Sequence, residues 1–173
     1  MRKPFMVEFT GTPEAGKTTS INNVANKLTG RGYKVSVLQE AAERLPPDIP
    51  KGTWDANLWM HYQTLSGIIQ ASYFQTDIIL IDRGLIDSSF YGKKFLWEGI
   101  CTKAQYQKFR QQFIDDLFPD FLIALTVLPE VAIKRRGGEG KLVNAEYLKS
   151  YNKLFMRFYS ALDCKKHLSI LHS

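Results

Sequence analysis

Residues 11–18 read GTPEAGKT and match the pattern G-x-x-x-x-G-K-[ST] at every fixed position. The short apolar run of residues 5–9 precedes this stretch, and a polar, helix-like segment from Lys17 to about Thr29 follows it. In such an arrangement a strand turns sharply into a helix, and its backbone N–H groups point inward around an anion. The stretch therefore predicts a phosphate-binding loop for a nucleoside triphosphate.

Each part of this loop has a chemical reason. Gly11 and Gly16 let the backbone close around phosphate without side-chain obstruction. Lys17 can reach the β- and γ-phosphates, the Thr18 hydroxyl can ligate Mg²⁺, and Thr19 adds a contact at the helix start. The predicted nucleotide-binding residues are Gly11, Thr12, Pro13, Glu14, Ala15, Gly16, Lys17, Thr18 and Thr19.

The length and composition of the chain indicate what class of protein contains this loop. The 173 residues suffice for one compact domain spanning residues 1–173, and 45% hydrophobic with 23% charged residues is an ordinary globular mixture. Disordered, collagen-like and disulfide-scaffold classes are thereby excluded. Cys101 and Cys164 show no metal-ligand spacing, so we interpret them as free intracellular thiols. The N-terminus fails as a signal peptide, and no stretch approaches a membrane span, which predicts a cytoplasmic protein without membrane contact.

Further apolar runs predict the rest of the fold. They lack polar alternation and are separated by helical stretches, which is typical of a parallel sheet covered on both faces. The expected strands are residues 5–9, 34–39, 78–81, 121–128 and the HLSIL run near the end. The expected helices are residues 17–29, about 55–75, about 102–117 and 145–162. This alternation predicts a three-layer α/β domain.

Other segments indicate which kind of phosphate-binding protein this is. No N-K-x-D motif for guanine is present, and no second domain exists for a motor to move. Residues 82–84 read DRG directly after the strand 78–81. The carboxyl end of a parallel strand lies in the binding crevice, so Asp82 can hold Mg²⁺ and Arg83 can bind a phosphate or a substrate hydroxyl. The alternative is a turn with a surface ion pair.

Two more features favour a small phosphotransferase. Glu40 follows the second strand and can accept the proton of a substrate hydroxyl, or alternatively pair with Arg44. Residues 134–141 read KRRGGEGK, which predicts a closing lid over about 134–144. Arg135 and Arg136 of this lid would stabilise the transferring phosphoryl group and exclude water, the alternative being a solvated basic turn.

With these residues placed, the sequence resembles the small P-loop nucleoside and nucleotide kinases, and within them the thymidylate kinase and deoxynucleoside kinase group. The resemblance rests on GTPEAGKT, QEAAERL, IDRGLIDSSFYG and VLPEVAIKRRGGEGK, and it covers most of the chain. It implies a five-stranded parallel sheet in the order 2-3-1-4-5, helices on both faces, a lid, and MgATP as phosphoryl donor. The DRG-L-x-D form is also similar to P-loop ATPases related to nicotinamide riboside kinases.

Site roles follow from the resemblance where residues match. Glu40 matches the acid that is the catalytic base of deoxynucleoside kinases. Asp82 and Arg83 match the acid–arginine pair written ERS in those kinases and DR in thymidylate kinases. Arg135 and Arg136 match the lid arginines. The chain departs from the pattern at Ala41, where deoxynucleoside kinases usually have proline.

The acceptor is a nucleoside or a nucleoside monophosphate. Glu40 favours a nucleoside, because its hydroxyl must lose a proton, and the basic lid favours a monophosphate. The helix over residues 55–75 is expected to line the pocket for the base, with Trp59 stacking on it and Gln63 bonding to its edge. For both residues burial in a helix interface is the alternative, and His61 is expected to be an ordinary surface or core histidine.

Net charge does not contradict this interpretation. The formal charge is +6, and residues 134–166 carry nine basic and three acidic residues, which accounts for all of it.

Alternatives to a nucleoside or nucleotide kinase are a nucleotide-dependent ATPase switch or binding protein, and a kinase of another small acceptor, such as a nucleoside of the nicotinamide riboside type. No nucleic-acid-binding motif is recognisable, so no nucleic-acid partner is expected. Related kinases are often dimers, which makes a homodimer the expectation.

Overall fold

The computed structural model describes residues 3–113, 117–138, 144–162 and 167–172. Its parallel sheet has the order β2-β3-β1-β4-β5, and every neighbouring pair of strands is parallel. The strands are β1 (Phe5–Gly11), β2 (Val35–Leu38), β3 (Ile78–Asp82), β4 (Phe121–Thr126) and β5 (His167–His172). The helices are α1 (Lys17–Thr29), the short 3₁₀ helix η1 (Ala41–Arg44), α2 (Trp54–Tyr73), α3 (Leu85–Trp97), α4 (Lys103–Arg110), α5 (Pro129–Arg136) and α6 (Ala145–Ser160).

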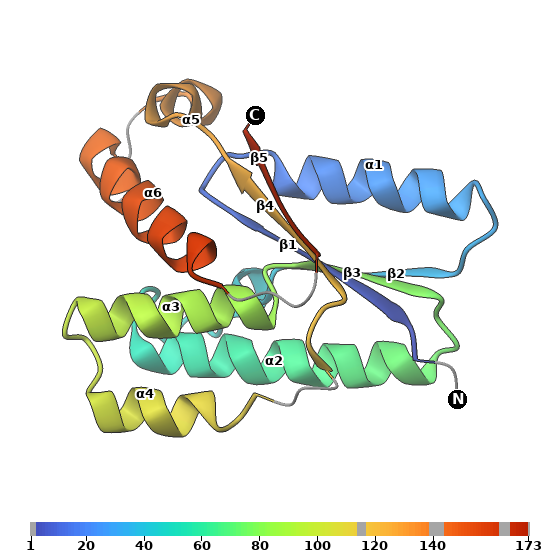
Figure 1. Ribbon diagram of the computed structural model, residues 1–173, viewed down its shortest axis with the longest axis horizontal. Helices are drawn as coiled ribbons and strands as arrows, with labels where there is room; N and C mark the ends of the chain where they lie inside the picture. The colour runs from blue at the N-terminus through green and yellow to red at the C-terminus, as the bar shows by residue number, and fades with distance from the viewer. Residues whose placement is uncertain (1–2, 114–116, 139–143, 163–166, 173) are drawn as a thin grey trace.

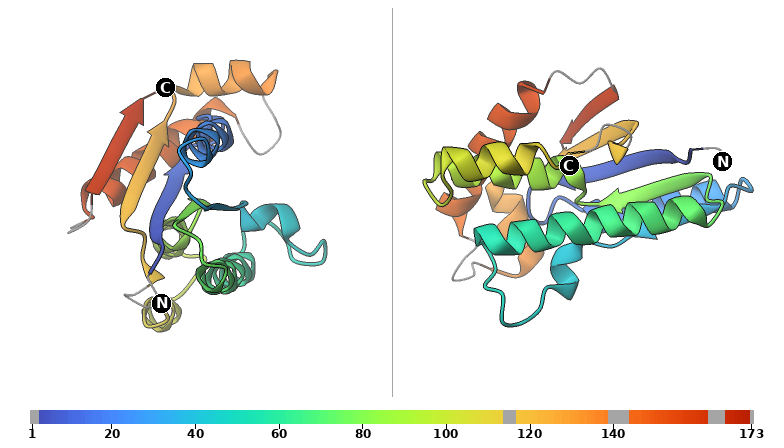
Figure 2. Two further views of the ribbon diagram at one scale, coloured as in Figure 1. Left: turned by 90° about the vertical axis from the view of Figure 1, so that its right-hand side faces the viewer. Right: turned by 90° about the horizontal axis from the view of Figure 1, so that it is seen from below.

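Helices cover both faces of the sheet, as Figures 1 and 2 show. One face packs against α1, where Phe9 and Leu80 join Ile21 in a single apolar cluster. The other face packs against α2, α3 and α6, where Met6 and Ile81 contact the α2 side. Because successive residues of a strand point to opposite faces, apolar residues at nearly every position give two cores rather than one. The predicted three-layer α/β fold, with its five-stranded sheet and strand order, is confirmed.

Strand polarity positions the site. All five strands run in the same direction, so their carboxyl ends lie at one edge of the sheet, on the left of Figure 1. The loop after β1, the end of β2 at Glu40 and the end of β3 at Asp82 therefore meet at that edge. In parallel α/β sheets this is the edge at which ligands bind.

The structure corrects the predicted elements between residues 83 and 128. The sequence predicted one helix over about 102–117, but α4 covers only residues 103–110 and residues 111–112 form a turn. Helix α3, which starts directly after DRG, was not predicted. The polar residues of this segment break a simple amphipathic pattern because they are buried at the site. Strand β4 ends at Thr126 rather than at residue 128, since Pro129 begins α5.

Two further findings concern membrane-spanning helices and the cysteines. Among the described residues, no helix combines the length and the apolar character needed to cross a bilayer. Cys101 is a buried free thiol that packs with Phe95 and Phe109, and Cys164 lies outside the described residues.

Candidate active site

The loop between β1 and α1 is held against β4. The backbone N–H of Thr12 donates to the carbonyl of Leu125 at 3.0 Å, and its hydroxyl accepts from the N–H of Val127 at 3.2 Å. A Cβ atom on Gly11 would lie 2.1 Å from the Leu125 carbonyl oxygen. Glycine is therefore required at position 11 by the close approach of β4 as well as by its φ of 152°.

Lys17 begins α1 and folds back over the loop. Its Nζ donates to the carbonyl oxygen of Thr12 at 3.2 Å, and the residue is 8% exposed. Burial, and after it the nearby Arg83 guanidinium, lower the pKa of Lys17 to about 8 against the opposing effects of Asp87, Asp82 and Glu40. An ammonium with few partners inside a glycine-rich turn is suited to bind a polyphosphate.

The Thr18 hydroxyl and the Asp82 carboxylate form an oxygen pair. Thr18 Oγ1 donates to Asp82 Oδ2 at 2.9 Å, while Asp82 Oδ1 is buried without a hydrogen-bond partner among the described residues. Hard oxygen ligands of this kind suit Mg²⁺, which keeps several waters and shares its ligands with phosphates. In the described ranges, no group of three or more His, Cys, Asp or Glu side chains is arranged so that it could hold a metal ion by itself. Phosphate oxygens of a nucleotide would complete the set.

Arg83 lies between two carboxylates. Its Nε is 3.2 Å from Glu40 Oε1, an ion pair without hydrogen-bond geometry, and its Nη1 donates to both oxygens of Asp87 at 3.3 Å. Burial opposes the charge of Arg83, but Asp87, Tyr91, Tyr151 and Glu40 together raise its pKa well above the ordinary value. The backbone at Arg83 has a φ of 56°, which is unusual outside glycine. The backbone is therefore strained at the residue that carries this guanidinium.

A buried polar chain continues from Asp87 into the sheet. The hydroxyl of Thr10 in β1 donates to Asp87 Oδ1, and it lies 2.8 Å from the hydroxyl of Tyr159 in α6. Burial raises the pKa of Tyr159 well above its ordinary value, so this phenol stays neutral. Asp87 is thereby held by Thr10, whose hydroxyl is in turn bonded to Tyr159, and Asp87 fixes the position of Arg83.

Glu40 closes the site on the β2 side. Burial raises the pKa of its carboxyl, and the Arg83 guanidinium opposes that shift. About one third of the side chain is exposed, so the carboxylate is accessible from solvent as well as from Arg83. A carboxylate with these properties can hold a hydroxyl group and take its proton.

Glu8 is a site residue that the sequence analysis missed. It lies in β1, is 0% exposed, and accepts the backbone N–H groups of Ile86 at 3.0 Å and Asp87 at 2.8 Å. Burial raises its pKa to about 8, against the opposing effect of these N–H groups. The available signal was a single carboxylate inside an otherwise apolar strand, and for Asp87 it was the spacing of four residues from Arg83.

The remaining loop and lid residues flank this centre. Arg135, at the end of α5, donates from Nη1 to the carbonyl oxygen of Glu14 at 3.0 Å, so α5 reaches the phosphate-binding loop. Arg136 is exposed on the same helix end, and residues 139–143 of the predicted lid lie outside the described residues. The other predicted loop residues differ in burial: Ala15 is buried, Pro13 and Gly16 are half-buried, and Glu14 and Thr19 are exposed.

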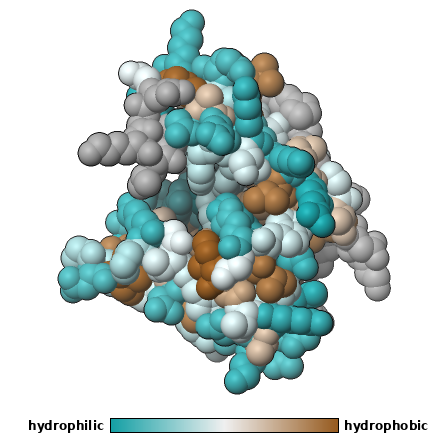
Figure 3. Space-filling model, turned by 90° about the vertical axis from the view of Figure 1, so that its left-hand side faces the viewer, coloured by the Kyte–Doolittle hydropathy of each residue, from teal (hydrophilic) through white to brown (hydrophobic). Residues whose placement is uncertain are grey.

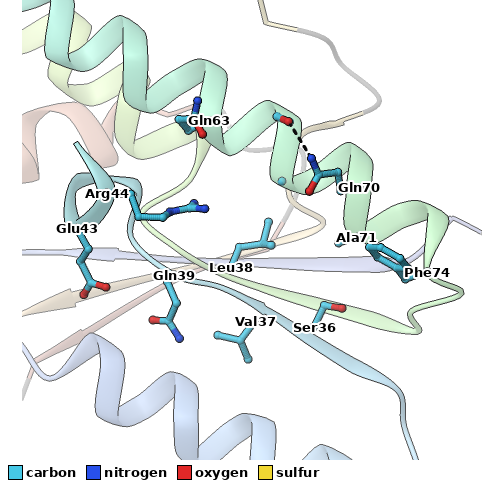
Figure 4. A pocket seen from close by; sticks show the side chains of 12 residues that line it. Ser36, Val37, Leu38, Gln39, Glu43, Arg44, Gln63, Gln70, Ala71 and Phe74 are labelled. Atoms are coloured by element: carbon cyan, nitrogen blue, oxygen red, sulfur yellow. Dashed lines mark hydrogen bonds between the residues drawn. The ribbon is translucent and has the colours of Figure 1, made fainter. Parts of the chain in front are cut away.

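No residue of the phosphate-binding loop lines the described cavity (Figure 4). It has a volume of about 520 Å³ and runs between β2 and α2, with Gln39, Arg44 and Gln63 towards one end and Phe74 at the other. Gln63 therefore lines a cavity together with Gln39, which precedes Glu40 in the chain, but Glu40 itself does not line it, and the acceptor role of Gln63 stays a prediction. Trp59 is half-buried on α2 and does not line it.

His61 is a core histidine. It is 0% exposed, and its ring lies 4.9 Å from that of Phe109 and 4.8 Å from that of Phe113. Its Nδ1 is 2.9 Å from Ser88 Oγ, whose hydrogen is donated to the Leu85 carbonyl, so Nδ1 carries the proton. Burial lowers the pKa of His61 to about 4. The expectation of an ordinary histidine agrees with these contacts.

The carboxyl edge of the sheet is hollowed at the surface. Figure 3 views the molecule from this edge and shows a recess rimmed mostly by hydrophilic side chains. A polar recess of this kind suits a charged, hydrated ligand better than an apolar one.

Comparisons with known proteins agree with the fold. No family model matches the chain, and the comparison with curated proteins gives no match. Among solved structures, the chain is similar to deoxyadenosine kinase from M. mycoides with the products dCMP and a flexible dCDP bound. That match has a TM-score of 0.72 and 22% identity, and covers 96% of this chain and 90% of the other.

A second structure of deoxyadenosine kinase from M. mycoides, with bound dATP, has a TM-score of 0.71 at 22% identity. That match covers 99% of this chain and 91% of the other. At this identity the two likenesses establish a shared fold over nearly the whole chain.

Proposed function

We propose that this protein is a kinase that transfers the γ-phosphoryl group of ATP, with Mg²⁺, to a hydroxyl group of a nucleoside. The observation that carries the proposal is the position of Arg83 between Glu40 and Asp87, next to Lys17 and the Thr18–Asp82 pair. A phosphate-binding loop alone fits many ATPases. A carboxylate paired with a buried arginine beside that loop supports an acceptor site.

The donor side rests on the loop and its neighbours. Backbone N–H groups of residues 11–18 would surround the phosphates, and Lys17 would neutralise their charge. Thr18 and Asp82 would hold Mg²⁺, which would supply positive charge to offset the charge that develops on the phosphates. Arg135 already contacts the loop at Glu14, and we propose that Arg135 or Arg136 stabilises the transferring group.

The charge around Arg83 favours a nucleoside over a nucleoside monophosphate. The guanidinium is compensated by two carboxylates, Glu40 at 3.2 Å and Asp87 at 3.3 Å. A phosphomonoester carries a charge of about −1.5 to −2 at pH 7 and needs cations that are not already paired. A neutral hydroxyl adds no charge to this cluster, and Glu40 can accept its proton.

The proposed step balances without a further reactant. The acceptor oxygen forms a bond to the γ-phosphorus while the bond from that phosphorus to the β–γ bridging oxygen breaks. ADP leaves with the electron pair, and the hydroxyl proton passes to Glu40. Arg83 orients Glu40 and the acceptor, so the protein acts by positioning and charge neutralisation.

The acceptor base is a further part of the proposal. The similar structures are kinases of a deoxynucleoside by their names, which supports a nucleoside acceptor here. We propose that Gln63, in the cavity between β2 and α2, binds the base edge, while stacking by Trp59 stays a prediction. A cytoplasmic location and a homodimer also stay predictions, and light scattering after gel filtration tests the second.

A screen of acceptors tests the proposal directly. Purified protein is incubated with MgATP and single nucleosides or nucleoside monophosphates, and ADP release is measured by a coupled assay. We expect ADP release stimulated by a nucleoside and lost in Lys17→Ala. Stimulation by monophosphates only would overturn the acceptor assignment, and slow ATP hydrolysis that no acceptor stimulates would support the ATPase switch instead.

A further inference from the structure

Helix α3 begins without a cap from its own sequence. Gly84 is the N-cap residue and has no side chain to accept the free N–H groups of the first turn. Those of Ile86 and Asp87 donate instead to Glu8, which lies 78 and 79 residues earlier in β1. Each oxygen of the Glu8 carboxyl accepts one of them, so a residue of the central strand provides the cap of this helix.

The glycine of DRG makes room for this carboxyl group. A Cβ atom on Gly84 would lie 2.5 Å from Glu8 Oε2 and 2.7 Å from Glu8 Cδ. The φ of Gly84 is −101°, so this glycine is not required by a left-handed φ. Glu8 and Gly84 therefore form a matched pair: the carboxyl occupies the space in which a local cap side chain would begin.

Three consecutive residues of β1 hold the segment that presents Arg83. Besides the Glu8 cap, the carbonyl of Phe9 accepts the N–H of Arg83 at 2.9 Å, and the hydroxyl of Thr10 donates to Asp87. Arg83 has a strained backbone and its guanidinium is bound by Asp87. If the N-terminus of α3 shifted, the Arg83 guanidinium and the Asp87 carboxylate would both move relative to Glu40.

We propose that Glu8 is a positioning residue of the acceptor site: by capping α3 from β1 it fixes Arg83 and Asp87 in the geometry that Glu40 requires. The inference rests on the proposed function where activity is concerned, while the cap itself is independent of it. Glu8 lies in β1, three residues before Gly11, and it makes no hydrogen bond or ion pair with Lys17, Thr18 or Asp82 among those of the described residues.

A double-mutant cycle between Glu8 and Gly84 tests the proposal. The variants are Glu8→Ala, Gly84→Ser and the combination, with Phe109→Leu in α4 as a destabilised control outside the site. Glu8→Ala is expected to lower kcat for acceptor phosphorylation by about 100-fold, as a displacement of about 1 Å can, with KM for ATP within about twofold of wild type. Phe109→Leu is expected to leave kcat near the wild-type value at a temperature where it is folded.

If Glu8 positions the site, the double variant should recover part of the lost kcat. If Glu8 only stabilises the fold, no such recovery is expected. Gly84→Ser alone collides with Glu8 and lowers kcat. In the Glu8→Ala background the hydroxyl introduced by Gly84→Ser has room to accept the N–H of Asp87, as a serine N-cap does. The double variant therefore regains part of the kcat that Glu8→Ala lost. Independent effects of the two substitutions, with no rescue, overturn the proposal.

Amide hydrogen exchange separates this inference from the proposed function. Exchange at Ile86 and Asp87 is expected to accelerate in Glu8→Ala and to slow again at Asp87 in the double variant, whether or not any acceptor is phosphorylated. If Glu8→Ala does not fold, Glu8→Gln retains one acceptor oxygen, and one of the two amides is expected to lose protection. Unchanged exchange at both amides in the folded variant overturns the proposal.

Discussion

Arg83 Nε lies 3.2 Å from Glu40 Oε1, which joins the carboxyl ends of β3 and β2 across the candidate site. The two residues are 43 positions apart in the sequence. Only the pairing of β2 with β3 brings these strand ends together. The acceptor chemistry that we propose depends on this contact, since it sets both the orientation of the carboxylate and its charge.

Replacing Glu40 tests the acceptor side without disturbing the donor side. Glu40→Gln is expected to lower acceptor phosphorylation by about 10²–10⁴-fold, the usual contribution of a general base, while binding of an ATP analogue stays near wild type. Coupled assays and calorimetry measure the two properties. Asp48→Asn, an exposed carboxylate in the following loop, is the control and is expected to behave as wild type. Equal loss of analogue binding in Glu40→Gln would contradict the assigned role.

The Thr18–Asp82 pair predicts a specific change in magnesium dependence. Asp82→Asn removes the charge next to the Thr18 hydroxyl but keeps an oxygen, so we expect the Mg²⁺ concentration for half-maximal activity to rise about 10–100-fold. Activity titrated with Mg²⁺ at constant ATP measures it. Asp77→Asn, at the exposed position just before β3, is the control for a lost carboxylate. An unchanged Mg²⁺ requirement in Asp82→Asn would show that Asp82 serves another purpose.

We expect Lys17 to lower the stability of the folded protein, although it is needed to bind the nucleotide. Its pKa is lowered to about 8 in the folded protein from 10.5, so the unfolded chain binds more protons between these values and stability rises with pH across that window. Below pH 8 the charged, buried form costs up to about 3 kcal/mol. Lys17→Met is therefore expected to be more stable than wild type at pH 7 and to lose activity.

Urea unfolding of both proteins at several pH values measures this effect. The stability advantage of Lys17→Met is expected to shrink from pH 8 towards pH 10, as wild-type Lys17 loses its proton. Lys27→Met, exposed near the end of α1, should show no such narrowing. A constant difference between Lys17→Met and wild type over this range would contradict the buried, shifted lysine.

Two glycines with positive φ differ in the space around them. Gly11→Ala places a Cβ 2.1 Å from a backbone carbonyl of β4, and we expect it to destabilise the fold by more than about 3 kcal/mol. Gly32, with a φ of 89° and nothing within 4 Å of its Cβ position, is the matched control, and Gly32→Ala is expected to cost only about 1–2 kcal/mol. The midpoints of urea unfolding compare Gly11→Ala with Gly32→Ala. Similar losses of stability in the two variants would mean that β4 moves to make room for the methyl group.

Residues that are contiguous in the chain could be predicted from it. The phosphate-binding loop is a single turn, so the spacing of Gly11, Gly16, Lys17 and Thr18 carries its geometry locally. Unalternated apolar runs likewise predicted a parallel sheet, because burial on both faces leaves a direct mark on composition. The strand order came from resemblance, and the structure confirms it. Helix α3 escaped prediction because Asp87 and Ser88 are buried there, where a periodic pattern expects apolar residues.

Tertiary structure alone decided how the site is held together. In the sequence Glu8 is only a charge in an apolar strand, and its role as the cap of α3 exists because β1 pairs with β3 in a register that sets Phe9 beside Asp82. The same holds for Thr10, which bonds to Asp87 from β1 and is itself bonded to Tyr159 of α6. Local spacing predicts where phosphate binds, because a single backbone turn is formed by residues close together in the chain. Strand pairing determined that Glu40 faces Arg83 and that Glu8 caps α3, because these contacts join residues far apart in the chain.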